Sequence, residues 1–206
     1  MKVQVYVRHT RSWYKKNRLT IAGYSVRSMW VEFSKSAGSN EERLCPCCRA
    51  RIKMFPKSRF TIPNPKKYRD IASSEDEYTF VSSDFKQFCQ QNGYDKLVFT
   101  AIKTKGFYYL DKSKLPMVRL EHYILPDVHQ CFYCGSTNVV GTPVVIKRAK
   151  VVDSDDFMVR TDIDNLSGPH GEPDMIVGPR TKEKMEAYGL KNLYFEPVYF
   201  YDYDHE

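Results

Sequence analysis

Two pairs of cysteines constrain this chain more than any other feature of its sequence. The first pair stands in Cys45-Pro46-Cys47-Cys48 and the second in Cys131-Phe132-Tyr133-Cys134-Gly135, with 82 residues between them. A C-x2-C turn places two thiolates on one side of a tight loop, which is one edge of a tetrahedral metal site. Pro46 stiffens the first turn, and Gly135 tolerates a positive φ after the second. We therefore expect the fold to bring the two turns together.

Four thiolates leave no open coordination position, so the sequence predicts a structural zinc ion held by Cys45, Cys48, Cys131 and Cys134. An iron–sulfur cluster is the alternative, because four thiolates also suit that chemistry. Disulfides within or between the pairs are less favoured, since nothing in the sequence indicates an oxidising compartment. Cys47 could replace Cys45 or Cys48 as a ligand, or be a spare thiol.

The sixth cysteine, Cys89, lies in a predicted helix beside Phe85 and Phe88. We interpret it as a small buried hydrophobic residue. A thioredoxin-like redox role is disfavoured for the two pairs, because neither opens a helix after a strand.

Length and composition fit one folded domain, residues 1–206, with a basic part at 1–70 and a part of sheet and helix at 71–206 that holds the second cysteine pair. The chain has 206 residues, of which 42% are hydrophobic and 14% aromatic. No apolar run approaches the roughly 20 residues of a membrane helix, and residues 1–16 have no signal-peptide core. We expect a soluble, cytoplasmic protein that does not bind membranes.

The net charge of +7 hides a gradient along the chain. Residues 1–70 carry 17 Lys and Arg against 4 Asp and Glu, whereas residues 151–206 carry 5 against 13. The basic part, with aromatic residues between its charges, could bind nucleic acid. It could equally pair with the acidic tail or meet an acidic partner protein.

The hydrophobic pattern predicts an α+β fold, mostly antiparallel sheet with two short helices and a zinc-ribbon-like site of four cysteines. One helix is expected to be capped by Asp84 and to run to about Asn92, before Gly93. The other is expected from Pro179 to about Tyr188, before Gly189. The expected strands are Lys2–Arg8, Leu19–Phe33 with a break near Ala22-Gly23, Arg59–Ile62, Leu97–Lys103, Gly106–Leu110, Met117–Leu125, Val144–Lys150 and Leu193–Tyr201. Loops are expected at Ser34–Arg43, Pro56–Tyr68 and Ser167–Pro173.

The two helical segments resemble each other at a constant offset of 96 residues. Val81, Cys89, Gly93, Leu97 and Phe99 correspond in this way to Val177, Met185, Gly189, Leu193 and Phe195. Two interpretations are open: an internal duplication, or a common supersecondary unit matched by chance.

Catalytic constellations are scarce, so the sequence does not predict an enzyme. The five histidines are His9, His122, His129, His170 and His205, and none lies in a known motif; His129 could only substitute for a cysteine ligand. The acidic stretch Asp153–Asp156, with Asp162 and Asp164, lacks the spacing and the glycine of a calcium loop. A solvated acidic face is the favoured interpretation.

The arrangement as a whole resembles the double-CXXCG immunity proteins found beside bacterial polymorphic toxins. The resemblance rests on the two cysteine motifs and on a tail that runs through Asp162-Ile163-Asp164, Met175-Ile176-Val177-Gly178-Pro179 and Gly189-Leu190-Lys191-Asn192-Leu193-Tyr194-Phe195-Glu196-Pro197-Val198. The matches are scattered over residues 40–200. This chain departs from the family pattern at Arg49, Asp164 and Gly178-Pro179-Arg180.

The resemblance implies a cytoplasmic protein of interbacterial competition that binds and neutralises the C-terminal domain of a cognate toxin, with the cysteines holding the fold. Such an inhibitor needs a rigid surface with aromatic anchors and complementary charge rather than chemistry of its own. The alternative is a zinc-ribbon nucleic-acid-binding protein that uses the basic N-terminal half.

Overall fold

The computed structural model describes most of the predicted sheet and helices. The described residues are 20–31, 43–47, 51–53, 60–68, 70–74, 78–118, 120–122, 129–130, 133, 137–138, 145–147, 153–165 and 172–201. The helices are α2 (Pro65–Tyr68), α3 (Ser83–Gln91) and α4 (Pro179–Tyr188). The strands are β1 (Ile21–Val31), β2 (Arg43–Leu44), β3 (Arg51–Lys53), β4 (Ile71–Ser74), β5 (Thr79–Ser82), β6 (Val98–Ala101), β7 (Phe107–Asp111), β8 (Met117–Val118), β9 (Leu120–His122), β10 (His129–Gln130), β11 (Thr137–Asn138), β12 (Val145–Lys147), β13 (Met158–Asn165), β14 (Glu172–Val177) and β15 (Leu193–Tyr201).

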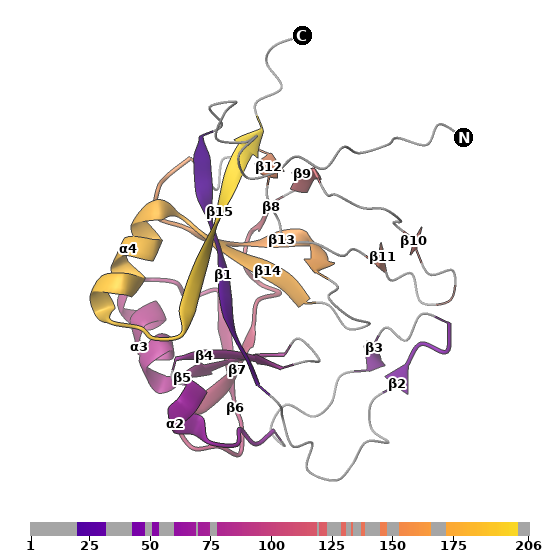
Figure 1. Cartoon of the computed structure of the whole chain (residues 1–206), viewed down its shortest axis with the longest axis vertical. Coiled ribbons are helices and arrows are strands. Elements are labelled where there is room, and N and C mark those ends of the chain that lie inside the picture. Colours follow the sequence, from indigo (N-terminus) through magenta and orange to yellow (C-terminus); the bar gives the residue numbers. More distant parts are fainter. Residues whose placement is uncertain are drawn as a thin grey trace.

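Most strands belong to one large sheet built around β1. Within the described part, strands follow the order β6-β7-β5-β4-β1-β14-β13-β8, and β15, β12 and β9 extend the sheet from the other edge of β1. Figure 1 shows β1 running through the length of the molecule. Only β4, β12 and β8 make parallel pairs, with β1, β15 and β13 respectively, and every other described pairing is antiparallel. The predicted α+β class, mostly antiparallel, is confirmed.

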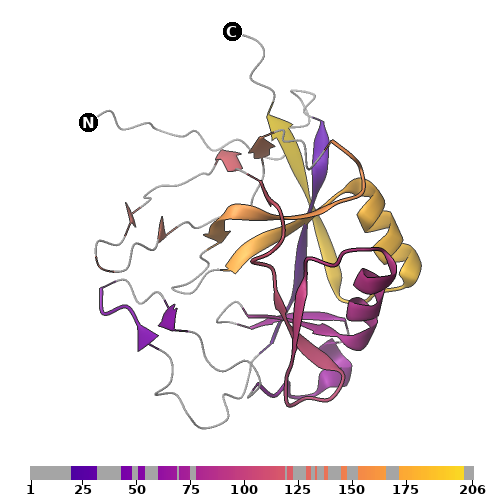
Figure 2. The same cartoon turned by 180° about the vertical axis from the view of Figure 1, so that it is seen from behind.

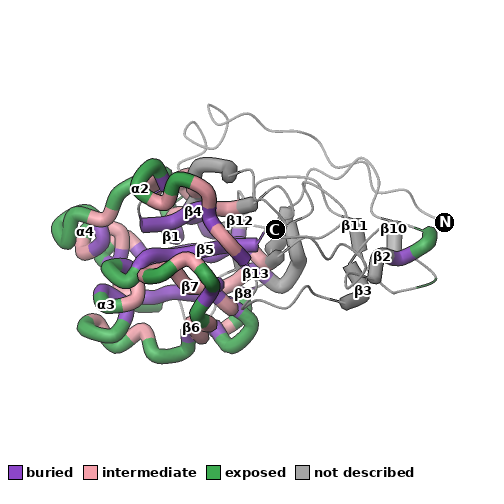
Figure 3. Tube along the Cα trace, turned by 90° about the horizontal axis from the view of Figure 1, so that it is seen from below, coloured by how far each residue is buried: buried purple, intermediate pink, exposed green. Residues whose placement is uncertain are grey.

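Helices α3 and α4 lie side by side against one face of this sheet (Figures 1 and 2). Alternation along β14 divides the core, because Met175 and Val177 face the helices whereas Ile176 belongs to a cluster on the opposite face. The rings of Phe88 in α3 and Tyr188 in α4 meet with centroids 5.4 Å apart. Figure 3 shows the buried residues concentrated in the strands and the exposed ones on the outer sides of the helices.

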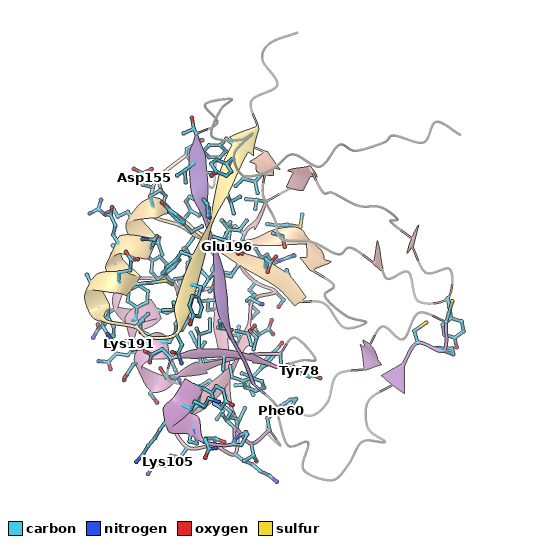
Figure 4. All side chains as sticks on the ribbon, in the orientation of Figure 1. Phe60, Tyr78, Lys105, Asp155, Lys191 and Glu196 are labelled. Carbon is cyan, nitrogen blue, oxygen red and sulfur yellow. The ribbon has the colours of Figure 1, made fainter. Side chains whose placement is uncertain are left out.

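A third core cluster, rich in aromatic rings, covers the other face of β4, β5 and β7. The centroid of Phe60 lies 4.6 Å from that of Tyr78 and 5.1 Å from that of Phe80, and Figure 4 shows Phe60 beside Tyr78. The segment Phe60–Ile62 is not a strand, contrary to expectation. It is fixed instead by two hydrogen bonds, from Lys103 N to Phe60 O and from Ile62 N to Thr104 Oγ1.

The two expected helices are present, and one of their caps differs from the prediction. Helix α4 begins at Pro179 and ends before Gly189, which has φ of 84° as a left-handed cap requires. Helix α3 is capped by Ser82 rather than by Asp84: Ser82 Oγ accepts a hydrogen bond from Phe85 N and donates one to Asp70. The loop expected at Pro56–Tyr68 contains the single turn α2 at its end.

Several predicted strands agree with the structure, and others were missed. β15 has the predicted bounds, β1 lies within Leu19–Phe33, and its register shifts between Ile21 and Gly23, where the break was expected. Met117–Leu125 contains the two short strands β8 and β9. Eight of the described strands were not among those expected from the sequence: β2, β3, β4, β5, β10, β11, β13 and β14. β14 begins at Glu172, inside the loop expected at Ser167–Pro173. The expected strand Lys2–Arg8 lies outside the described residues. None of the described helices is long and apolar enough to span a membrane.

Candidate metal centre

Each cysteine pair belongs to a small hairpin of its own. β2 pairs antiparallel with β3, and β10 pairs antiparallel with β11. Cys45 follows β2 directly, and in the sequence Cys131 follows β10 directly. In the sequence, both cysteine motifs therefore fall between the two strands of a hairpin.

The two hairpins lie at the same side of the molecule, away from α3 and α4 (Figures 1 and 2), although 82 residues separate their cysteine motifs in the sequence. β2 with β3 and β10 with β11 form two separate two-stranded sheets.

The described thiols of the first hairpin differ in exposure. Cys45 is fully buried, at 0% relative exposure, whereas Cys47 is exposed. Ligands of a structural zinc site are shielded from solvent by the loops that carry them. Burial therefore favours Cys45 over Cys47 as a ligand.

Three of the four predicted ligands, Cys48, Cys131 and Cys134, lie outside the described residues. Within the described part, no group of three or more His, Cys, Asp or Glu side chains is placed to hold a metal ion. That part contains only Cys45 of the four ligands, so the zinc site stays a prediction. Tyr133, between the second pair, is exposed at 62%.

Cys89 is separate from both hairpins. It is fully buried in α3, in the core cluster between the helices and the sheet. Burial raises the pKa of its thiol well above the ordinary value. The interpretation of Cys89 as a small hydrophobic core residue is confirmed, and its thiol is not prepared for metal binding or redox chemistry.

The acidic stretch Asp153–Asp156 has two different roles. Asp153 and Asp155 are exposed, as expected of a solvated face. Asp156 instead accepts hydrogen bonds from Tyr94 Oη at 2.5 Å and Thr181 Oγ1 at 2.9 Å, and its other oxygen lies 2.5 Å from Lys184 Nζ. It ties the turn after α3 to the first half of α4.

The electrostatics of Asp156 follow from these partners. Partial burial alone would raise the pKa of its carboxyl, but the hydrogen bonds from Lys184, Tyr94 and Thr181 outweigh that effect, so the pKa lies below its ordinary value. Burial and the hydrogen bond to Asp156 raise the pKa of Tyr94. No signal within the acidic stretch distinguishes Asp156, because Tyr94 is 62 positions away.

The loop that carries Asp156 also packs closely on the start of α4. Arg180 N donates to Asp155 O at 3.0 Å, and a Cβ at Gly178 would overlap with the same oxygen. Figure 4 shows Asp155 and Lys191 at opposite ends of α4. This loop is part of the scaffold, which leaves only Asp153 and Asp155 available to a partner.

No family model matches the chain, and the comparisons with curated proteins and with solved structures return no match either.

Proposed function

We propose that this chain is a binding protein without chemistry of its own, an immunity protein of the double-CXXCG type that neutralises the catalytic domain of a cognate toxin. The observation that carries the proposal is the position of the two cysteine hairpins, β2–β3 and β10–β11, at the same side of the molecule (Figures 1 and 2). A four-thiolate zinc site shared by them would fix two distant segments with no position left for a substrate. The function itself rests on the resemblance of the motifs and of the tail, whose residues fall largely in β13, β14, α4 and β15.

The acidic C-terminal third is the proposed contact surface for a basic toxin domain. Residues 151–206 carry 13 Asp and Glu against 5 Lys and Arg. Asp153 and Asp155 are exposed, whereas Asp156 is engaged inside the protein. A charged face of this kind steers the encounter of partners and selects among them more than it adds affinity.

The test is protection of cells that express the toxin domain encoded by the gene immediately upstream. We expect the unmodified chain to protect them and to co-purify with that domain at one to one. The double variant Asp153→Lys, Asp155→Lys should protect less at low expression, and Asp84→Lys, at an exposed site in α3, is the matched control. A chain that fails to protect cells or to bind the toxin domain would contradict the proposal.

A zinc-ribbon protein that binds nucleic acid is the second candidate, because exposed lysines come from two segments joined by the aromatic core. Lys66 and Lys67 lie in α2, and Lys103 and Lys105 lie in the turn between β6 and β7. Binding to a phosphate backbone falls steeply with salt, whereas a packed protein interface keeps much of its affinity. Strong, salt-sensitive binding to DNA or RNA without any effect on the toxin would favour this candidate.

A further inference from the structure

Two four-stranded parts of the sheet have the same construction. The order β6-β7-β5-β4 in one corresponds to β15-β1-β14-β13 in the other. In each part a strand leads into a helix (β5 into α3, β14 into α4), and the strand after the helix returns at the edge of the group. A further strand, β7 or β1, is inserted between these two.

The register of the two parts is also the same. Tyr108 of β7 and Tyr24 of β1 hold equivalent positions in the inserted strands. Their partners before and after the helix differ by 96 positions in each case: Val81 and Ala101 pair with Tyr108, and Val177 and Pro197 pair with Tyr24. At the other edge of β5, Ile71 pairs with Val81, and at the other edge of β14, Met158 pairs with Val177. These two pairs are equivalent, because Val81 corresponds to Val177.

The helix ends repeat hydrogen bond by hydrogen bond. After α3, Gly93 N donates to Gln90 O and Tyr94 N donates to Cys89 O. The two bonds after α4 are at the same offset of 96: Gly189 N to Glu186 O, and Leu190 N to Met185 O. If the helix and strand of the two parts were alike by chance, the strand register, the helix cap and the strand order would not all agree as well.

A surface feature repeats as well. Lys86 Nζ lies 4.2 Å from the ring centroid of Tyr108 and 5.9 Å from that of Phe99. The corresponding Lys182 Nζ lies 5.3 Å from the centroids of both Tyr24 and Phe195.

Contacts between the two parts are reciprocal. The turn after α3 reaches Asp156, just before β13, through the hydrogen bond that Tyr94 Oη donates. The turn after α4 reaches Asp70, just before β4, through the hydrogen bond from Lys191 N to Asp70 Oδ2, at 2.6 Å. Each part thus makes to the other the same kind of contact that the other makes to it. Such reciprocal contacts are typical of two units related by a twofold axis.

In a simple repeat, each inserted strand would come from the same half of the chain as the strands around it. Here each inserted strand comes from the other half. β1 precedes β4, β5, α3 and β6 in the sequence but is inserted between β14 and β15, and β7 follows β6 but is inserted between β5 and β6. Both segments then continue to the opposite part in parallel pairing: Trp30 and Val31 of β1 pair with Ser73 and Ser74, and Met117 and Val118 of β8 pair with Arg160 and Thr161. Each residue of the pairing between β8 and β13 stands 87 positions after its counterpart in the pairing between β1 and β4.

We propose that residues 20–103 and 106–201 are two copies of one unit, produced by tandem duplication, which have exchanged their first strands across a pseudo-twofold axis. The first copy begins with β1, and the second begins with β7 and β8. A cysteine hairpin, a pair of antiparallel strands, a helix and a last strand follow in both. The protein is thus the single-chain form of a strand-swapped dimer.

The duplication assigns the cysteines to equivalent pairs. Leu44 pairs with Arg51 in the first hairpin as Gln130 pairs with Thr137 in the second, an offset of 86. At that offset Cys45 and Cys48 correspond to Cys131 and Cys134, and Cys47 corresponds to Tyr133, which is exposed as Cys47 is. Each copy would give two ligands to one metal ion near the axis, and Cys47 would not be a ligand. This assignment rests on the zinc site proposed above, whereas the duplication does not.

A circular permutant of the full chain tests the duplication. In it Glu206 is joined to Met1 and the chain opens between Lys105 and Gly106, so that the second copy precedes the first. Because Ile21 at the start of β1 pairs with Tyr199 near the end of β15, as Ala101 pairs with Tyr108 across the turn that is opened, we expect a cooperative unfolding transition within about 10 °C of the original. A permutant opened inside a copy, between Asp95 and Lys96, should melt lower. The proposal is overturned if the permutant opened between the copies does not fold, or melts below the one opened within a copy.

Cobalt(II) titration tests the assignment of the cysteines, because thiolate-to-cobalt absorbance reports the number of sulfur ligands. Cys45→Ser and Cys131→Ser should lose charge-transfer intensity equally and weaken cobalt binding by factors within about threefold of each other. Cys47→Ser and Tyr133→Ser should leave both unchanged. Loss of a sulfur ligand in Cys47→Ser would overturn the assignment of the cysteines. A chain that binds no cobalt at all would refute the zinc site, and the duplication would then be tested by the circular permutant alone.

Discussion

At the scale of single residues, Asp156 differs most from its neighbours in the sequence. Asp153 and Asp155 are exposed, but Asp156 is held by Tyr94, Thr181 and Lys184. The composition of the stretch predicts a solvated face, which is true of two of these aspartates. The third joins the two helices because its partners come from distant positions that only the fold brings near.

Replacing this carboxylate should destabilise the protein. We expect Asp156→Asn to lower the melting temperature at pH 7 by about 3–12 °C, since a hydrogen bond to a charged group contributes about 1.5–3 kcal/mol and 1 kcal/mol shifts the midpoint by about 2–4 °C in a domain of this size. Thermal unfolding followed by circular dichroism measures the shift. Asp155→Asn, at an exposed neighbour, is the control and should change the midpoint by less than about 2 °C. Equal effects of the two variants would contradict the role assigned to Asp156.

The same residue predicts a dependence on pH. Its pKa is lowered in the folded protein, so its stabilisation is complete above the unfolded value, about 3.9, and is lost as the pH falls through the folded pKa. Urea unfolding between pH 7 and pH 2.5 should therefore show a shallower loss of stability in acid for Asp156→Asn than for the unmodified protein. Parallel curves would contradict this explanation.

At the scale of helices and strands, the sequence predicted those elements whose ends or whose alternating pattern depend on residues within the element itself. Pro179 and Gly189 define α4 by their own backbone preferences, and β15 has a long alternating pattern. β4 and β13 were missed because their strand character depends on pairing with distant partners, and β13 is acidic and has a register shift between Arg160 and Asp164. The cap of α3 was misplaced since Asp70, which supports Ser82, is remote from it in the sequence.

The start of α4 gives a test at this scale. Gly178→Ala should be strongly destabilising, because the new Cβ would overlap with the Asp155 carbonyl oxygen and the backbone would have to move. The matched control is Gly106→Ala, where φ is 81° and the nearest atom is 3.5 Å away. There only the backbone conformation is strained, at about 1–2 kcal/mol. Urea unfolding measures both, and equal losses would contradict the close packing of the loop on α4.

At the scale of the whole molecule, the cysteine spacing predicts a shared metal site, and the hairpins β2–β3 and β10–β11 lie at the same side of the molecule (Figures 1 and 2). The pattern at an offset of 96 indicated a repeat but not its extent. The exchange of first strands could not be read from the sequence, because each half alone is compatible with pairing to its own first strand. Only the register of β1 and β7 in the sheet distinguishes the two arrangements.

Removal of the metal should affect the hairpins before the sheet. β2–β3 and β10–β11 each form a two-stranded sheet apart from the large sheet that α3 and α4 cover. We therefore expect a chelator to speed amide hydrogen exchange in residues 43–53 and 129–138 by at least about tenfold, with much smaller changes in α3 and α4. Uniform acceleration over the whole chain would contradict a separate hairpin module.

The metal content of the purified protein tests the central claim most directly. Freshly reduced protein, analysed by mass spectrometry of its metals, should hold close to one zinc ion per chain. Cys131→Ser should hold much less, and Cys89→Ser, whose thiol lies in the core, should hold as much as the unmodified protein. Iron in place of zinc, with absorbance near 400 nm, would indicate that the same four cysteines bind an iron–sulfur cluster. Neither zinc nor iron in the reduced, folded protein would contradict the account.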